Sequence, residues 1–431
     1  MRLILKNFHI VDEAADTIGN VIIDDGVITA LQPDKSSVSA CDAEMIIDGS
    51  RFLSSKKLPV LMPAFVDLHA HFRDPGFPEK ETLESASLAA AAGGFGAVVC
   101  MANTQPVTDT IEKAAALKSR SDTCGLIDLY PVLSLSKDME GRELSEIGSI
   151  NAAGCYIPLM LSEDGKDLSD DALFLAAMRE AKRIGIPVSC HCDFGGENNA
   201  VRRAIELGKK AGCHIHIAHV STKEAVEMIR RAKAATKAAA EIGGFTLSCE
   251  ATPHHLCLNE EDAARLGNGS HGRVNPPLRS EEDRKALIRA VADGTIDAIA
   301  TDHAPHNRAD KEAGAPGFTG FETAFAAVYT ELIRGRGSSG PEFINQIDLK
   351  YLSSLMSANP ARLLGLCNGS QKQGRILPGY RANLVILDTE GSWIVDPSLF
   401  KSRGKNSPFE GRRLYGKILM TFHSGKTVFG R

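Results

Sequence analysis

The sequence predicts an α/β protein built on a (β/α)8 barrel, with a small β-sandwich domain assembled from both ends of the chain. Three observations lead to this prediction. The chain has 431 residues, more than the about 250 residues of a typical barrel. Eight short apolar runs in its middle part alternate with segments long enough for helices. The two ends instead carry short alternating strands separated by turn residues.

The expected barrel strands are runs of apolar and β-branched residues. They fall at residues 60–71, 96–101, 126–134, 154–161, 185–191, 214–219, 245–253 and 297–303. The segments between them, such as DDALFLAAMREAKRIG and SEEDRKALIRAVADG, place apolar residues at helical spacing. Strands that alternate with helices in this number predict the barrel.

The ends of the chain have the period-two pattern of half-buried strands. LILKNFHIVD and NVIIDDGVITAL lie near the N-terminus, and ANLVILD and GKILMTFHSGKTVFG lie near the C-terminus. We therefore expect residues 1–57 and 367–431 to form one β domain beside a barrel of residues 58–366.

The composition is that of a globular protein. Hydrophobic residues make up 43% of the chain and charged residues 24%, and the net charge is only -5. We therefore expect no nucleic-acid partner and no membrane association, because no apolar run reaches the roughly 18 residues that span a bilayer. The first residues lack the apolar segment and cleavage site of a secretory signal, which predicts a cytoplasmic protein.

The ten cysteines are scattered along the chain and form no C-x-x-C pair. Cys190 and Cys192 flank His191, which raises the question of a thiolate metal site. Strand alternation points both thiols away from the face that His191 uses. We interpret them as small buried apolar residues.

Polar residues gather where the expected barrel strands end. In a parallel barrel these C-terminal ends open on one face, which carries the catalytic groups. The residues that end or directly follow strands in this way are His69, His71, Asp164, His191, His219 and Asp302.

These six residues predict a metal centre. His69 and His71 are two apart, so both imidazoles project from one face of a strand. Four imidazoles and two carboxylates exceed the ligands of one tetrahedral zinc, which predicts two metals sharing a bridging carboxylate and a bridging hydroxide. Imidazole and carboxylate without thiolate suits Zn²⁺, with Mn²⁺ or Co²⁺ as alternatives. Such a centre performs hydrolysis, and Asp302 is placed to be both a ligand and the general acid or base.

Further polar residues follow the same strand ends. Arg73 lies just past the first pair of histidines, and Asn103 and Asn275 follow the second and seventh strands. A guanidinium beside amides is suited to a planar substrate that carries a carboxylate.

Nine segments in order carry a resemblance to a known family. They are DLHAHFRDPG, KETLES, ANTQP, SEDGK, HIAHVST, ATPHHL, NPPLR, ATDHAPH and GFETA. Through them essentially the whole chain resembles the type I dihydroorotases of the amidohydrolase superfamily.

The resemblance implies a role for each residue. His69 and His71 would bind one metal, His191 and His219 the other, with Asp164 between them and Asp302 completing the first site as acid or base. The residues implied to bind substrate are Arg73, Asn103 and His306 for the carboxylate, Asn275 for the ring, and the backbone near Gly320 and Phe321 for the ring edge. The implied reaction is the reversible interconversion of L-dihydroorotate and N-carbamoyl-L-aspartate in pyrimidine biosynthesis.

The resemblance also bears on two points that the residues leave open. His254 and His255 could replace His219 as a ligand on spacing alone, and the family pattern favours His219. The loop at 305–324 is rich in glycine and charge and is expected to contact substrate. The segment between His191 and His219 is shorter than usual in the family, and we expect this difference to affect subunit contacts or a rim of the pocket rather than the ligands.

Two other functions compete with this interpretation. A dihydropyrimidinase, hydantoinase or allantoinase would share the metal ligands, but Arg73 and His306 favour a substrate with a carboxylate. A noncatalytic scaffold for aspartate transcarbamoylase would be expected to have lost ligands, and all six are present. We expect a small-molecule substrate, one or two zinc ions per subunit and a homodimer, with association with aspartate transcarbamoylase as a further option.

Overall fold

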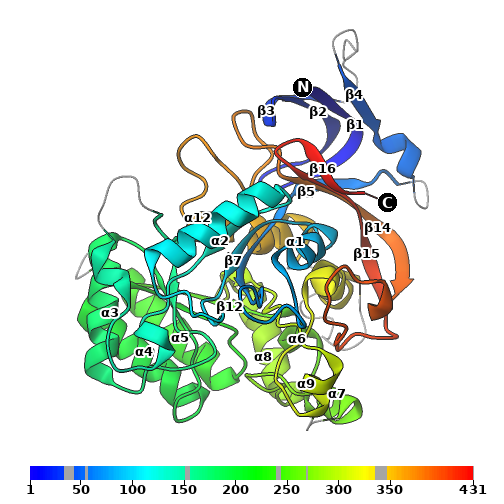
Figure 1. Ribbon diagram of the computed structural model, residues 1–431. Coiled ribbons are helices and arrows are strands. Elements are labelled where there is room, and N and C mark those ends of the chain that lie inside the picture. The colour runs from blue at the N-terminus through cyan, green and yellow to red at the C-terminus, as the bar shows by residue number, and fades with distance from the viewer. Residues whose placement is uncertain are drawn as a thin grey trace.

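The computed structural model describes residues 1–33, 43–53, 57–150, 156–238, 244–267, 270–334 and 347–430. Figure 1 shows a helix-surrounded body and, beside it, a sheet in which the first and last strands of the chain lie together. Among the described helices, none combines the length and apolar character needed to cross a bilayer.

The body is a barrel of eight parallel strands, as predicted. The strands are β6 (Phe65–Ala70), β7 (Phe95–Cys100), β8 (Asp128–Pro131), β9 (Leu161–Ser162), β10 (Val188–Cys190), β11 (His214–Ile217), β12 (Thr246–Ala251) and β13 (Ala298–Ile299). They pair in chain order as a three-stranded and a five-stranded sheet. Parallel bridges from Leu133 to Leu161 and from Ala70 to His303 join the two sheets into a ring.

Helices follow the barrel strands and cover the ring. The α-helices are α1 (Leu83–Ala92), α2 (Ile111–Cys124), α3 (Asp171–Ile184), α4 (Glu197–Ala211), α5 (Lys223–Ala238), α6 (Pro253–Cys257), α7 (Glu260–Leu266), α8 (Glu281–Ala292), α9 (Arg308–Glu312), α10 (Ala324–Tyr329), α11 (Leu349–Ser353) and α12 (Asn359–Leu363). The shorter turns are η1 (Gly49–Phe52), η2 (Lys137–Met139), η3 (Glu146–Ser149), η4 (Phe321–Thr323), η5 (Thr330–Arg334), η6 (Ser354–Ala358) and η7 (Pro397–Leu399).

Local sequence signals set the ends of these helices, as α3 illustrates. The Asp170 carboxylate accepts hydrogen bonds from the backbone amides of Ala172 and Leu173, which satisfies donors that have no partner inside the helix. Gly185 ends the helix in the left-handed conformation, at a φ of 80°.

A separate eight-stranded sheet, outside the barrel, is built largely from the two ends of the chain. Its strands are β1 (Arg2–Val11), β2 (Asp16–Asp24), β3 (Val27–Pro33), β4 (Met45–Asp48), β5 (Val60–Pro63), β14 (Leu384–Ile394), β15 (Arg413–His423) and β16 (Lys426–Gly430). They run in the order β16-β15-β14-β5-β1-β2-β3, and β4 also pairs with β1. Residues from both ends, including Phe8, Ile23, Leu384 and Phe422, form a separate apolar core.

The apolar run at 60–71, expected to be one strand, is two strands. β5 pairs with β1 and β14 in the terminal sheet, whereas β6 is a barrel strand. Ala64 separates them: its amide donates to Asn383 O at 2.9 Å, and the amide of Phe65 donates to Gly94 O at 2.9 Å. The prediction of one strand is therefore wrong, because consecutive residues bond to different sheets.

The strand expected at 154–161 is also displaced. Residues 154 and 155 lie outside the described residues, and the strand formed here, β9, is Leu161–Ser162. Although β9 is short, Asp164 still follows the C-terminal end of this strand, as predicted.

Candidate functional site

The structure brings the side chains of all six predicted ligands together at the C-terminal end of the barrel. Ligand atoms of His69, His71 and Asp302 lie within 4.8 Å of one another, and so do those of His69, Asp164 and His219. His191 joins them, because its Nδ1 lies 3.1 Å from Oδ1 of Asp164 and 3.0 Å from Nε2 of His219.

Closure of the barrel aligns the first and last of these strand ends. The amide of Asp302 donates to His69 O at 3.0 Å, and the amide of His71 donates to His303 O at 2.8 Å. These bonds fix β6 and the segment after β13 side by side, so His69, His71 and Asp302 share one face.

Three of the predicted site residues have left-handed backbone conformations. The φ angles are 58° for Arg73, 32° for His219 and 47° for Asp302. Residues other than glycine rarely adopt such angles, and those that do concentrate at functional sites. The turns direct these three side chains toward the pocket at the end of the barrel.

Asp164 occupies the centre of the cluster. Its Oδ1 lies 3.3 Å from Nε2 of His69 and 3.3 Å from Nε2 of His219, and its Oδ2 lies 3.3 Å from Nε2 of His71. Burial alone would raise the pKa of Asp164, but the neighbouring imidazoles of His69 and His191 outweigh burial and hold this pKa well below its usual range. The carboxylate is therefore ionised and faces both groups of histidines.

Asp302 is the second buried carboxylate of the cluster. Its Oδ1 lies 3.2 Å from Nε2 of His71 and 3.6 Å from Nε2 of His69. Burial would raise the pKa of Asp302, yet the hydrogen bond with His71 and the nearby His69 lower it. Asp302 is thus available as an ionised ligand or base.

The donor set fits divalent cations. His69 is fully buried, and its Nε2 has no hydrogen-bond partner although it lies near both carboxylates. A buried polar atom of this kind calls for a partner, and a cation between the imidazole and the carboxylates would supply one. Imidazole nitrogens and carboxylate oxygens are the ligands of zinc and related metals.

A cavity of about 230 Å³ opens above the cluster. Its lining residues are His71, Arg73, Asn103, Asp164, Gly165, His191, His219, Asn275, Asp302, Ala304, His306, Pro316 and Gly317. Four residues that the sequence predicts to bind substrate, Arg73, Asn103, Asn275 and His306, therefore surround the same space as the predicted metal ligands.

Hydrogen bonds hold these four side chains in place. Arg73 Nε donates to Pro305 O at 3.3 Å, and its Nη2 lies 3.3 Å from Nε2 of His306. Asn103 Oδ1 lies 2.9 Å from Nδ1 of His71, and Asn275 Nδ2 lies 3.3 Å from Nε2 of His191. The two asparagines thus link the pocket to two of the predicted metal ligands.

Gly320 and Phe321 are not among the residues that line this cavity, so the structure does not bring them together with the other predicted substrate contacts. The backbone amides of Gly320 and Phe321 donate to Nδ1 of His303 at 3.1 and 3.4 Å, and the Phe321 ring stacks on His303 with centroids 4.1 Å apart. Their donors are therefore already occupied behind the site. Pro316 and Gly317, earlier in the same loop, line the cavity instead.

His254 and His255 lie outside the two ligand groups, in agreement with the choice of His219. His255 Nδ1 lies 2.8 Å from Thr252 Oγ1, and its Nε2 donates to Pro276 O at 3.0 Å. Burial lowers the pKa of His254 to about 4. Both imidazoles are therefore buried groups beside the site.

The cysteines that flank His191 face away from the cluster. Cys190 and Cys192 are buried in the main apolar core, and burial holds the pKa of both thiols well above its usual range. Neither belongs to a ligand group among the described residues.

Sequence reasoning missed Glu250, which contacts a predicted ligand from below. Its Oε1 lies 3.1 Å from Nδ1 of His69, and its Oε2 lies 3.0 Å from Nε2 of His216. Burial would raise the pKa of Glu250, but hydrogen bonds from His216 and His69 outweigh burial and lower it to about 2. The available signal was an acidic residue inside the apolar strand at 245–253.

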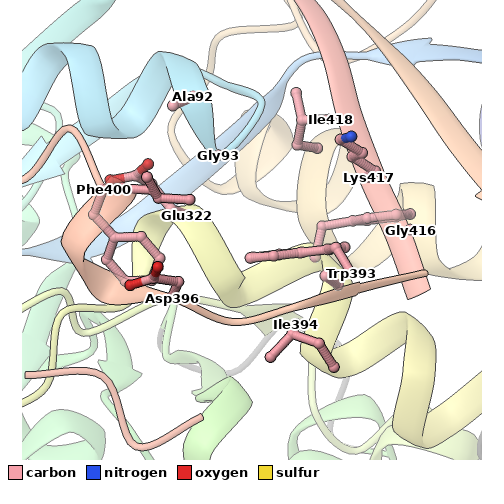
Figure 2. Close-up of a pocket in the computed structure, with 13 residues that line it drawn as sticks. Ala92, Gly93, Glu322, Trp393, Ile394, Asp396, Phe400, Gly416, Lys417 and Ile418 are labelled. Atoms are coloured by element: carbon pink, nitrogen blue, oxygen red, sulfur yellow. The ribbon is translucent and has the colours of Figure 1, made fainter. Parts of the chain in front are cut away.

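A second pocket lies outside the barrel, against α10, β14 and β15 (Figure 2). Its lining is largely apolar and includes Trp393, Phe400 and Ile418, with Glu322 and Asp396 beside them. None of the six predicted metal ligands lines this pocket, so it is separate from the metal site.

Comparison with known proteins agrees with this geometry. Residues 60–428 match the model of the Amidohydrolase family. A dihydroorotase of Clostridium botulinum is 37% identical, covering 100% of both chains, and one of Geobacillus sp. is 35% identical, covering 94% of this chain and 93% of its own.

Solved structures share the fold. The L-hydantoinase (dihydropyrimidinase) from Arthrobacter aurescens superposes with a TM-score of 0.82 at 25% identity, covering 99% of this chain and 96% of its own. The dihydropyrimidinase from Brevibacillus agri has a TM-score of 0.80 at 21% identity, covering 100% and 95%. Family match and full-length relatives together show that the chain belongs to the amidohydrolase family and, within it, to the dihydroorotases.

Proposed function

We propose that this metal-dependent cyclic amidohydrolase interconverts L-dihydroorotate and N-carbamoyl-L-aspartate through the residues of the cavity described above. The observation that carries the proposal is the position of Arg73. Its guanidinium lines the cavity beside the proposed metal ligands, and its polar contacts among the described residues are Pro305 O and Nε2 of His306 rather than a carboxylate. A cation held in this way is matched by a carboxylate on the substrate.

Six residues would hold the metal ions. His69, His71 and Asp302 form one ligand group, His191 and His219 form the other, and Asp164 lies between the two. When bound, the metals supply an activated water and polarise the carbonyl of the scissile amide. We propose Zn²⁺, because these nitrogen and oxygen ligands suit it.

Arg73, Asn103 and His306 would orient the substrate. The guanidinium of Arg73 offers two parallel donors to the substrate carboxylate, and the Asn103 amide adds a donor from the adjacent strand end. Burial and the nearby Arg73 lower the pKa of His306 to about 3, so its imidazole is neutral. Asn275 would contact the ring from the opposite side of the cavity.

Asp302 would move the proton. In the hydrolytic direction its carboxylate accepts a proton from the attacking water and passes it to the ring nitrogen as the amide bond breaks. In the direction of ring closure the same group takes the proton from the carbamoyl nitrogen. Its lowered pKa keeps the base form present at neutral pH.

The test is a ring-opening assay on the purified protein. L-Dihydroorotate is supplied beside dihydrouracil, hydantoin and allantoin, with and without a chelator. Turnover confined to dihydroorotate and lost on chelation supports the proposal. Turnover of an uncharged ring instead would assign the chain a dihydropyrimidinase or hydantoinase activity, and no turnover by a folded, metal-loaded protein would favour a scaffold.

Assembly and location complete the proposal. We propose a homodimer in the cytoplasm, with association with aspartate transcarbamoylase as an option for the active enzyme. Light scattering of the purified protein gives the number of subunits, and copurification with the transferase from the native host tests the association.

A further inference from the structure

A column of polar side chains extends from the metal centre into the barrel. It begins at His69 and continues through Glu250, His216 and Ser248 to His214. His216 and Ser248 are register partners on the neighbouring strands β11 and β12, and Glu250 and His214 lie two residues from them on the same faces. Glu250, His216 and Ser248 are all at most 3% exposed.

Each link of the column is a short contact. Glu250 Oε1 lies 3.1 Å from His69 Nδ1, and Glu250 Oε2 lies 3.0 Å from His216 Nε2. Ser248 Oγ lies 2.8 Å from Nδ1 of His216 and 2.8 Å from Nε2 of His214.

One arrangement of protons satisfies every link with neutral imidazoles. His69 Nδ1–H and His216 Nε2–H both donate to Glu250, whose carboxylate can only accept. His216 Nδ1 then lacks a proton and accepts from the Ser248 hydroxyl, which in turn accepts from Nε2–H of His214. The hydrogen bonds from both sides therefore converge on the carboxylate of Glu250.

This placement of protons determines which nitrogen of His69 can bind a cation. With its proton on Nδ1, His69 presents the lone pair of Nε2, the atom that lies near Asp164 and Asp302 without a hydrogen bond. A partner that holds the other ring nitrogen of a metal-binding histidine fixes its tautomer and orientation.

We propose that Glu250 is a positioning residue of the metal centre, held in place by His216, that fixes His69 in the tautomer whose Nε2 binds the cation. The proposal rests on the proposed function, because it takes His69 as a ligand. It adds that a carboxylate below the site, with no access to substrate, sets the affinity for metal.

Glu250→Gln tests the proposal with little change of shape. The amide has one accepting oxygen and one donating NH₂ group, so it cannot accept from both His69 and His216. One imidazole must then change its tautomer or lose its bond. We expect the dissociation constant for Zn²⁺ at the site that includes His69 to rise by about 10- to 100-fold.

Asp128→Asn is the matched control. Asp128 is also a buried carboxylate, 7% exposed, and its Oδ1 lies 3.1 Å from Nε2 of His423. It begins β8, at the opposite end of the barrel from the metal ligands, and also accepts from Arg381. This variant should lose thermal stability without a change in Zn²⁺ affinity.

The measurement is Zn²⁺ binding to full-length, metal-stripped protein in competition with a chromophoric chelator, with circular dichroism as the test of folding. If the wild type binds no Zn²⁺, the proposed function fails. If it binds and folded Glu250→Gln binds equally well, only the role of Glu250 is overturned.

A second pair of variants keeps the test open if Glu250→Gln does not fold. His216→Leu removes the donor to Oε2 of Glu250 and should weaken Zn²⁺ binding, whereas His216→Gln retains an N–H donor and should restore most of the affinity. Equal affinities in His216→Leu and the wild type would overturn the proposal, as would equal losses in both His216 variants.

Discussion

Nε2 of His71 lies 3.2 Å from Oδ1 of Asp302, although 231 positions separate the two residues in the chain. The contact exists because the barrel closes: β6 and the segment after β13 are joined by the bridge from Ala70 to His303. The first and last strands of the ring therefore supply one ligand group, and the residues at this seam are the most direct to test.

Asp302→Asn should reduce turnover by about 10²- to 10⁴-fold, because the amide cannot accept and pass on the proton. The amide oxygen still offers a contact to a cation, so metal content and melting temperature should change little. The measurement is kcat for dihydroorotate with metal analysis of the same sample. A variant that keeps its metal and wild-type kcat would exclude Asp302 as the acid or base.

Arg73→Ala should raise KM for dihydroorotate by about 10- to 100-fold, because a hydrogen bond to a charged group contributes about 1.5–3 kcal/mol. The effect on kcat should be smaller. Arg308→Ala is the control. Arg308 lies in the loop at 305–324, pairs with Glu312 and has a side chain that is 87% exposed. An unchanged KM in Arg73→Ala would remove Arg73 from the substrate site.

Removal of metal should abolish activity and lower the melting temperature. Both buried carboxylates face Nε2 of His69, Asp164 at 3.3 Å and Asp302 at 3.6 Å, and this nitrogen has no hydrogen-bond partner that a cation would replace. Added Zn²⁺ stabilises the folded state in proportion to the logarithm of its concentration over the dissociation constant. Calorimetry and assay of one sample, before and after readdition, measure both effects; activity in metal-free protein would contradict the prediction.

Lys311→Met should raise KM, because Lys311 holds the loop that lines the pocket. Its buried Nζ donates to the carbonyls of Arg273 and Ala315 at 2.9 Å and to Gly317 O at 3.0 Å. Without the ammonium, Gly317 loses this anchor beside the cavity. Lys426→Met, at an exposed lysine, is the control and should leave KM unchanged.

We also expect the buried Lys311 to make the free energy of unfolding depend on pH. Burial, with a smaller effect of Arg273, lowers the pKa of Lys311 to about 8, whereas an unfolded lysine titrates near about 10.4. Between these values the unfolded chain binds more protons. The free energy of unfolding of the wild type, relative to Lys311→Met, should therefore rise with pH across this window, by up to about 1.4 kcal/mol per unit. Urea titrations of both proteins at several pH values measure the difference, and a flat difference would contradict it.

The sequence was sufficient to predict the barrel and the clustering of the six candidate ligands, because strand ends are local features and parallel strands bring them to one face. It was not sufficient at Ala64. β5 and β6 are both fully buried, so no change of pattern marks the point where the chain moves from one sheet to another.

The remaining differences depend on contacts between distant parts of the chain. The path of the loop past Gly317 is held by Lys311 and by the Arg273 carbonyl, and nothing local places Pro316 rather than Gly320 at the cavity. Glu250 acquires a role only through His69, 181 positions away.

The junction at Ala64 also bears on what the ends of the chain do for catalysis. The strand that carries His69 is the direct continuation of a strand held on both sides by the terminal sheet. Removing either end would leave β5 with unpaired amides and carbonyls just before the strand that carries His69, and such groups are costly when buried. The terminal sheet therefore anchors the strand that carries the proposed ligands His69 and His71, and a protein trimmed to its barrel would lose this anchor.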